Sequence, residues 1–288
     1  MSAGRRLLIT GASGFLGSVL LHRAVAEGWA VAGTCFSHPG DESAPAPLHR
    51  LDLRDTASVA ALIGNFQPEV VIHTAYSQND RAVTFGGTLA LAEVCRGLDS
   101  PPHFIQVSTD LVFDGQKGNY SEQDEPCPLM AYGRDKLDAE LAVRRTMPKA
   151  LIVRAALIYD LERLPVHLKF ASGAIARGET FTFFEDEYRS PVLAGELAGA
   201  LLAMAGRGTV GLLHVGGADR VDRWWFGLRL MRALGLPTDL ARPGSSRSLS
   251  QPRPADCSLD SSRAGALLGV RFRGAREVFA GCNPELEA

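Results

Sequence analysis

The chain has 288 residues, 46% of them hydrophobic, which is enough to build a sizeable core. Its 30 basic and 32 acidic residues give a formal net charge of -2, so neither nucleic acid nor an anionic membrane surface is expected as a partner. No apolar run reaches the roughly 20 residues that span a bilayer, and no secretory signal pattern opens the sequence, so we expect a cytoplasmic protein.

In the first half, short apolar runs alternate with helix-length amphipathic stretches. The predicted strands are Arg6–Thr10, Ala30–Cys35, Leu48–Leu51, Val70–Thr74, Phe104–Ser108 and Leu151–Arg154. The predicted helices are Phe15–Glu27, Thr56–Gly64, Arg81–Arg96 and Ala131–Arg145. This alternation is typical of a parallel sheet with helices on both faces, so we predict a Rossmann-type doubly wound α/β fold.

The pattern changes after about residue 157. Helices are predicted at Val166–Arg177, Leu193–Ala205 and Val221–Leu234, strands at Phe181–Phe184 and Leu212–Val215, and a loop at Pro243–Pro254. We therefore expect a dinucleotide-binding domain over residues 1–157. Residues 158–288 would form a smaller α/β substrate-binding lobe that shares elements with the first domain.

The cysteine pattern favours reduced thiols. The five cysteines are Cys35, Cys95, Cys127, Cys257 and Cys282; their number is odd and they include no CxxC pair. Neither a disulfide framework nor a zinc site is expected, and no His/Asp/Glu group has metal-ligand spacing.

A glycine-rich turn lies between the first predicted strand and the first predicted helix. It reads Gly11-Ala12-Ser13-Gly14-Phe15-Leu16-Gly17. A dinucleotide pyrophosphate needs backbone N–H groups that point at it with no Cβ in the way, and a helix N-terminus adds a favourable dipole. The position between strand and helix favours this function over a plain turn.

Two further positions bear on the choice of cofactor. Asp52 ends the third predicted strand and could accept a hydrogen bond from an adenine amino group, or it could stabilise a turn. Asp55 is the better candidate for the following N-cap. The stretch Thr34–His38 has neither the carboxylate that holds a ribose 2′-OH nor an arginine, which favours NADP(H), with NAD(H) as the alternative.

Tyr132 and Lys136 form a YxxxK pair at the start of a predicted helix, where a spacing of four puts both side chains on one face. A nearby ammonium stabilises a phenolate, so Tyr132 could serve as a proton donor. Ser108 and Thr109 end the preceding strand, at the edge of the sheet where ligands bind. We assign the hydroxyl that holds a substrate carbonyl to Thr109, with Ser108 as the competitor.

Several charged residues remain open between two roles. Asp110 could cap a turn or bind substrate hydroxyls. Arg154, Arg189 and Arg253 could bind a diphosphate bidentately or form salt bridges. His73, on a predicted buried strand, is interpreted as a hydrogen-bonded core histidine.

The order of these motifs resembles that of the dTDP-4-dehydrorhamnose reductases, a family of extended short-chain dehydrogenases/reductases. The resemblance covers most of the chain. It rests on Val107–Gly115, Tyr120–Glu122 and Tyr132–Glu140, with support from Pro68–Ala75, Asp186–Pro191, Arg253-Pro254 and Leu259-Asp260.

The resemblance implies a reaction and a set of contacts. Hydride would pass from a nicotinamide to the 4-keto carbon of a nucleotide-linked sugar, while Tyr132 protonates the oxygen. Implied substrate contacts are Thr109 and Asp110. Implied cofactor contacts are Gly14, Phe15, Leu16, Asp52, Leu53, Thr74, Ala75, Tyr76, Tyr132 and Lys136.

The chain departs from the family pattern at several points. Residues 76–84 form a shorter segment than in the family, Thr84 replaces an asparagine, and Leu157 replaces an aromatic residue. Two alternatives therefore stay open. One is a nucleotide-sugar epimerase or dehydratase; the other is an NADP-binding regulatory subunit, because the β subunit of methionine adenosyltransferase resembles the chain about as well. A monomer or homodimer is expected.

Overall fold

The computed structural model describes residues 4–36 and 44–282, with only the backbone of Cys282. These residues form two compact units, each built from separate stretches of chain. The first unit runs up to Thr109 and adds Ala131–Arg154 and Leu197–Leu213. The second unit consists of Asp110–Met130, Ala155–Glu196 and the chain from His214 onward.

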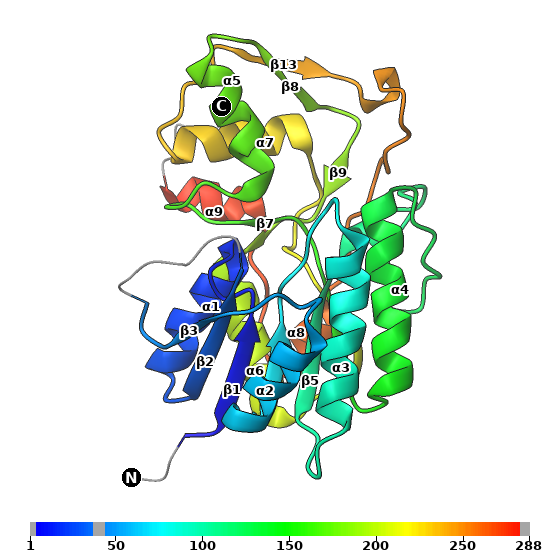
Figure 1. The fold of residues 1–288 in the computed structure, drawn as a ribbon. Coiled ribbons are helices and arrows are strands. Elements are labelled where there is room, and N and C mark those ends of the chain that lie inside the picture. Colours follow the sequence, from blue (N-terminus) through cyan, green and yellow to red (C-terminus); the bar gives the residue numbers. More distant parts are fainter. Residues whose placement is uncertain (1–3, 37–43, 283–288) are drawn as a thin grey trace. The chain divides into compact units, whose positions relative to one another are not determined.

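A seven-stranded sheet forms the centre of the first unit (Figure 1). Its strands are β1 (Arg6–Thr10), β2 (Ala30–Cys35), β3 (Leu48–Arg50), β4 (Val70–His73), β5 (His103–Thr109), β6 (Leu151–Ala155) and β11 (Gly211–Val215). The order is β11-β6-β5-β4-β1-β2-β3, and the pairings from β3 to β5 are parallel. The order reverses between β1 and β4, which confirms the predicted Rossmann-type fold.

Helices cover the sheet because their apolar faces meet its buried strands. The helices of this unit are α1 (Phe15–Ala26), α2 (Thr56–Phe66), the π-helix η1 (Ala82–Gly87), α3 (Thr88–Arg96), α4 (Ala131–Thr146) and α6 (Ala194–Arg207). Ile63, Leu91 and Val143 of α2, α3 and α4 pack in one fully buried cluster with Val71 and Phe104 of the sheet. Full burial of such a side chain stabilises the fold by about 1.5–3 kcal/mol.

β11 and α6 come from the second half of the sequence but complete the first unit. β11 is an edge strand of the large sheet, next to β6. Gly199 of α6 packs against Arg23 of α1, where an added Cβ would lie 2.5 Å from Nη1 of Arg23. A domain boundary near residue 157 stays a prediction.

The second unit contains three two-stranded sheets around its own core. The pairs are β7 (Ile158–Tyr159) with β10 (Val192–Leu193), β8 (Phe181–Phe184) with β13 (Ala241–Gly244), and β9 (Tyr188–Arg189) with β12 (Val221–Asp222). Its helices are η2 (Asp110–Val112), η3 (Val166–Leu168), α5 (Lys169–Ala176), α7 (Arg223–Ala233), η4 (Ser246–Ser248), α8 (Ser262–Leu268) and α9 (Ala275–Cys282). Tyr159, Phe183, Phe226 and Phe279 are among the buried side chains of this core.

Some predicted elements differ from the structure. The helix predicted from Val221 begins only at Arg223, because extended Asp222 caps it by accepting a hydrogen bond from the Trp225 N–H. The predicted loop 243–254 begins with two residues of β13 and contains η4. The predicted helix from Arg81 opens as the π-helix η1.

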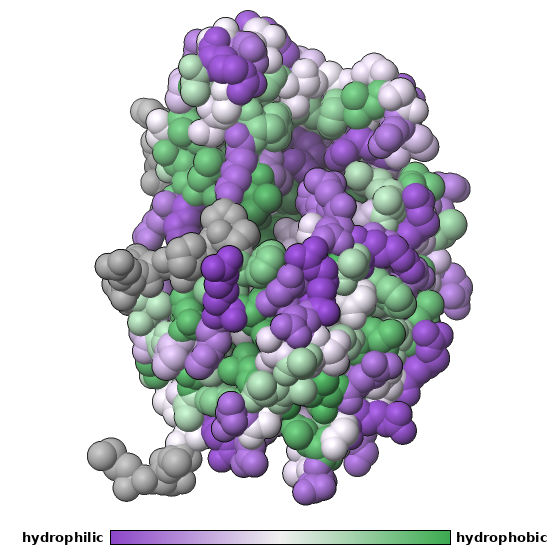
Figure 2. All heavy atoms as spheres, viewed as in Figure 1, coloured by the Kyte–Doolittle hydropathy of each residue, from purple (hydrophilic) through white to green (hydrophobic). Residues whose placement is uncertain are grey.

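The visible surface of the first unit is mixed in polarity. Figure 2 shows hydrophilic and hydrophobic residues interspersed over that face. Among the residues that the structure describes, no helix has both the length and the apolar character needed to cross a bilayer.

Candidate active site

The glycine turn is fixed by close backbone approaches. Gly11 has φ +69°, and an added Cβ there would lie 2.9 Å from the backbone of Ala75. An added Cβ at Gly17 would lie 2.1 Å from the carbonyl oxygen of Gly11. Gly14 N-caps α1 without a side-chain hydrogen bond. Together with Ser13, the turn has the compact backbone and helix N-terminus that a dinucleotide pyrophosphate requires, so the residues present fit such a cofactor.

The segment after β4 borders this turn. The Thr74 hydroxyl donates to the carbonyl oxygen of Thr10 at 2.7 Å, which fixes the end of β4 against β1. Ala75 is the residue that Gly11 approaches. The predicted contacts Thr74, Ala75 and Tyr76 thus follow directly from a strand next to the glycine turn.

Asp52 binds Arg54. Nε and Nη2 of Arg54 donate to the two carboxylate oxygens of Asp52 at 2.9 and 2.7 Å. These hydrogen bonds hold the pKa of Asp52 below its usual value. The Arg54 guanidinium also lies 5.6 Å from the ring centroid of Phe36, the residue after β2. If Asp52 also bound an adenine amino group, its carboxylate would serve both the adenine and Arg54. The neighbouring Leu53 packs against Gly87.

The NADP(H) prediction rested on Thr34–His38. Ser37 and His38 lie outside the described residues.

Tyr132 and Lys136 lie on α4, and both contact one ring. The ring centroids of Tyr132 and Tyr76 are 5.5 Å apart. Nζ of Lys136 lies 5.9 Å from the centroid of Tyr76 and donates to the carbonyl oxygen of Val107 at 2.6 Å. Val107 is two residues before Thr109 on β5, so the structure brings the predicted catalytic residues Thr109, Tyr132 and Lys136 to one region of the first unit.

Lys136 is only 4% exposed. Burial lowers the pKa of its ammonium to about 8, while the nearby carboxylate of Glu140 opposes this shift. Below pH 8 the group is therefore mainly an ammonium, the form that stabilises a phenolate.

Glu140 forms a buried pair with Arg154 beneath this site. Nη2 of Arg154 lies 2.8 Å from Oε2 of Glu140, and both side chains are almost fully buried. The Ser108 hydroxyl also donates to Glu140. Because Ser108 and Arg154 are bound to Glu140, the geometry favours Thr109 over Ser108 as the substrate contact. Glu140 has no predicted role, although its position four residues after Lys136 put both on one helix face.

Thr84 fixes the segment between β4 and η1. Its hydroxyl donates to the carbonyl oxygen of Ser77 at 2.6 Å and accepts from the Ser77 N–H at 2.9 Å. Arg81, just before η1, pairs with Asp135 and Asp138 of α4 at 2.5 and 2.7 Å. These contacts hold Tyr76 in a short, constrained segment beside α4. Single π-turns within helices are frequent at functional sites.

His73 is part of a buried chain of hydrogen bonds. The Thr88 hydroxyl donates to the carbonyl oxygen of Thr84, so it accepts from Nε2 of His73, at 2.8 Å. Nδ1 of His73 then accepts from the Thr10 hydroxyl at 2.6 Å. Burial and the charge of Lys136 lower the pKa of His73 to about 3. These contacts agree with the predicted core role.

In the second unit, Asp110, Arg189 and Arg253 gather around Glu187. Nε of Arg189 lies 3.5 Å from Oδ2 of Asp110, and Arg253 pairs with Glu187. The structure thus places the predicted substrate residues of this unit in one cluster of charges.

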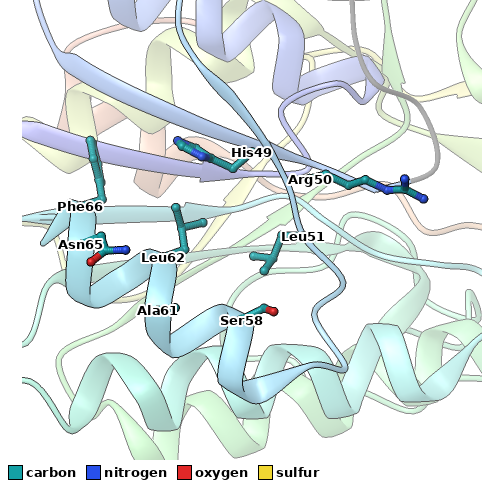
Figure 3. Close-up of a pocket in the computed structure, with 8 residues that line it drawn as sticks. All are labelled: His49, Arg50, Leu51, Ser58, Ala61, Leu62, Asn65 and Phe66. Atoms are coloured by element: carbon teal, nitrogen blue, oxygen red, sulfur yellow. The ribbon is translucent and has the colours of Figure 1, made fainter.

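A hollow of about 430 Å³ lies elsewhere in the first unit (Figure 3). Its lining includes His49 and Leu51 from the β3 segment and Leu62 and Phe66 of α2. None of the predicted site residues lines it.

The chain is similar to known proteins along almost its whole length. A family model described as RmlD substrate binding domain matches residues 5–285. The probable low-salt glycan biosynthesis reductase Agl14 of Haloferax volcanii is 34% identical over 278 residues, with 91% of each chain covered. Methionine adenosyltransferase 2 subunit beta of Xenopus laevis is 30% identical over 299 residues, covering 96% of this chain and 87% of that protein.

A solved structure shows the same fold. The dTDP-4-dehydrorhamnose reductase of Bacillus anthracis, in complex with NADP, has a TM-score of 0.79 at 20% identity. The match covers 98% of this chain and 99% of that chain.

Proposed function

Because the chain belongs to the RmlD substrate binding domain family, we propose that it is an NAD(P)-dependent reductase of a nucleotide-sugar 4-ketone. Family membership is the established part of this statement, and the reaction is the proposed part. The observation that carries it is the grouping of Thr109, Tyr132 and buried Lys136 in the first unit.

Each side chain of this group has its own part in the proposed reaction. A bound nicotinamide would supply hydride to the carbonyl carbon. The Tyr132 hydroxyl donates its proton to the carbonyl oxygen, so that the C=O bond becomes CH–OH and a phenolate remains. The Lys136 ammonium stabilises that phenolate, and the Thr109 hydroxyl donates a hydrogen bond that orients the carbonyl.

The cofactor is proposed to be NADP(H), with NAD(H) as the alternative. The backbone of residues 11–17 supports a dinucleotide of either kind. The Bacillus anthracis reductase of the same fold holds NADP. Gly11, Ser13, Gly14, Phe15, Leu16 and Gly17 would surround its diphosphate.

Replacement of the proton donor tests the proposal. Tyr132→Phe is expected to lower turnover of dTDP-4-dehydrorhamnose, or of the best 4-keto nucleotide sugar in a panel, by about 10²–10⁴-fold. NADPH oxidation followed by absorbance gives turnover, and equal NADPH affinity of both proteins excludes misfolding as the cause. Full turnover by the variant would refute the proposal.

A regulatory role is the second candidate. It is supported by the 30% identity to the methionine adenosyltransferase subunit beta and by Thr84 and Leu157, which depart from the reductase pattern. In that case the wild-type protein would bind NADPH and copurify with a partner enzyme. It would not oxidise NADPH with any keto sugar of the panel. An epimerase or dehydratase would instead retain NAD and consume no reduced cofactor.

A further inference from the structure

Four buried polar side chains of the first unit lie together beside the predicted catalytic residues. Glu140 lies one helical turn after Lys136 on α4, so the two side chains share a helix face. Ser108 lies near the end of β5, and Arg154 lies on β6, the next strand of the sheet. All four are at most 5% exposed, so water does little to weaken the forces between their charges.

The carboxylate of Glu140 binds both strands. Its Oε1 accepts from the Ser108 hydroxyl and from Nε of Arg154, and its Oε2 accepts from Nη2 of Arg154 at 2.8 Å. A hydroxyl has one proton to donate, and Ser108 donates it to Glu140. While Glu140 holds this proton, Ser108 has none for a substrate carbonyl, and its neighbour Thr109 is the better donor.

Glu140 also acts on the charge of Lys136. Nζ of Lys136 donates to the carbonyl oxygen of Val107 at 2.6 Å, which fixes the ammonium near the end of β5. Burial lowers the pKa of Lys136 to about 8, and the negative charge of Glu140 opposes this effect. Without that carboxylate, Lys136 would lose its proton at a lower pH.

The groups that face Lys136 from other elements cannot replace Glu140. His73 of β4 is neutral, because burial and the charge of Lys136 lower its pKa to about 3. The ring of Tyr76 lies 5.9 Å from Nζ of Lys136, and burial raises the pKa of Tyr76, so its hydroxyl keeps its proton. Arg154 is a cation, which disfavours a second positive charge nearby, and Glu140 binds it.

The other ionisable groups of α4 near Lys136 are also accounted for. Asp135 and Asp138 both pair with Arg81, the residue before η1. Tyr132, the proposed proton donor, is neutral until it gives up its proton. Glu140 is therefore the carboxylate of α4 whose charge acts on Lys136.

We propose that Glu140 is a positioning residue of the reductase site: its carboxylate keeps the Lys136 side chain in the ammonium form and holds Ser108 away from the substrate. This role rests on the proposed function, because both effects reach the ketone only through Lys136 and Thr109. The ion pair with Arg154 fixes the carboxylate between α4 and the sheet. A carboxylate in this position lets the protein bury a lysine and still keep its charge.

Titration of the lysines by NMR measures the effect of Glu140 without any substrate. The chain has four lysines, Lys117, Lys136, Lys149 and Lys169. With ¹³C-labelled lysine, the full-length protein therefore gives four sets of side-chain signals, and Lys136→Met identifies the set of residue 136. The titrated proteins all carry Tyr132→Phe, because two interacting groups titrate as a pair.

The variants separate the charge of Glu140 from its packing. Glu140→Gln removes the charge, and Glu140→Asp retains it. Loss of one partner of a buried ion pair can unfold a protein, so Glu140→Gln is also combined with Arg154→Met, which leaves no charge of the pair behind. Glu93→Gln is the matched control, because Glu93 is an exposed carboxylate on the neighbouring α3.

At pH 8 about half of Lys136 should be ammonium in the protein with Glu140, and about a tenth in Glu140→Gln. The double variant should also lie below half, Glu140→Asp should restore most of the ammonium form, and Glu93→Gln should change nothing. With Tyr132 intact, the fall of kcat/KM at alkaline pH should begin at a lower pH in Glu140→Gln. A merely structural role of Glu140 would lower kcat/KM at every pH without moving this fall.

An unchanged titration of Lys136 in Glu140→Gln and in the double variant would overturn the inference, and so would an unmoved alkaline fall of kcat/KM. Both results could occur while ketone reduction proceeds, which would leave the proposed function intact. Conversely, the expected titration in a protein that reduces no keto sugar would support the action of Glu140 on Lys136 and refute the reductase.

Discussion

At the residue scale, Lys136 lowers the stability of the folded state while it supports the proposed reaction. Its ammonium is buried, and its pKa of about 8 lies below the usual value of 10.5. The folded state therefore favours the neutral form more than the unfolded chain does. Burial of the ammonium costs stability in full below pH 8, and the cost falls as pH rises from 8 towards 10.5.

Lys136→Met is accordingly expected to stabilise the protein and abolish turnover. At pH 7 the free energy of unfolding should rise by about 1–3 kcal/mol. Loss of the hydrogen bond to the Val107 carbonyl reduces this gain. Urea denaturation at pH 7 and pH 9.5 measures this, and the gain over wild type should shrink at the higher pH. Lys149→Met, at an exposed lysine, is the control. A loss of stability at pH 7 would contradict the account.

Motifs identified single residues only where the motif itself carries the chemistry. The YxxxK spacing and the end of β5 together predicted that Tyr132, Lys136 and either Thr109 or Ser108 meet, and their roles stay predictions. The choice between Ser108 and Thr109 needed Glu140, whose contacts depend on how α4 packs on β5 and β6.

At the scale of elements, the first turn of α1 lies so close to the glycine turn that Gly17 has no room for a methyl group. The Cβ of an alanine at Gly17 would lie 2.1 Å from the carbonyl oxygen of Gly11, so the turn and the helix would have to separate. The Cβ of an alanine at Gly64, inside α2, would meet nothing within 4 Å beyond its own stretch of the helix.

Gly17→Ala is therefore expected to weaken NADPH binding at least tenfold and to lower the melting temperature. Gly64→Ala should leave binding unchanged and stabilise the protein by up to about 1 kcal/mol, because alanine favours a helix over glycine. Thermal melts with and without NADPH measure both effects. Unaltered NADPH affinity in Gly17→Ala would mean that the turn does not form the dinucleotide site.

Apolar periodicity predicted most elements of the first unit, including β1 and β2 to the residue. It could not predict η1, because apolar spacing over six residues does not distinguish a π-helix from an α-helix. The short strands of the second unit were also hard to predict. Two-residue strands such as β9 and β12 have too few positions to show alternation.

At the scale of the whole molecule, motif order was the most informative signal, and the family predicted from it is confirmed. The substrate was not predictable to the same depth. Its predicted contacts in the second unit, Asp110, Arg189 and Arg253, come from distant parts of the sequence and meet around Glu187 only in the fold.

The arrangement of the first unit predicts the behaviour of a fragment. A chain of residues 1–157 lacks β11 and α6, so β6 would become an unpaired edge strand and α1 would lose its neighbour. We expect this fragment to aggregate or to unfold without cooperativity, and not to bind NADPH. Calorimetry of the purified fragment tests this; a sharp transition that NADPH shifts upward would contradict it.

The late position of β11 in the sequence also affects how the sheet folds while the chain is synthesised on the ribosome. The strand that covers β6 is made only after the whole stretch from residue 155 to 196, which belongs to the other unit. Until it emerges, the nascent sheet exposes a buried-type apolar edge, the kind of surface on which chains pair wrongly. The edge of β6 is therefore most open to wrong pairing, and most in need of chaperones, during this interval of translation.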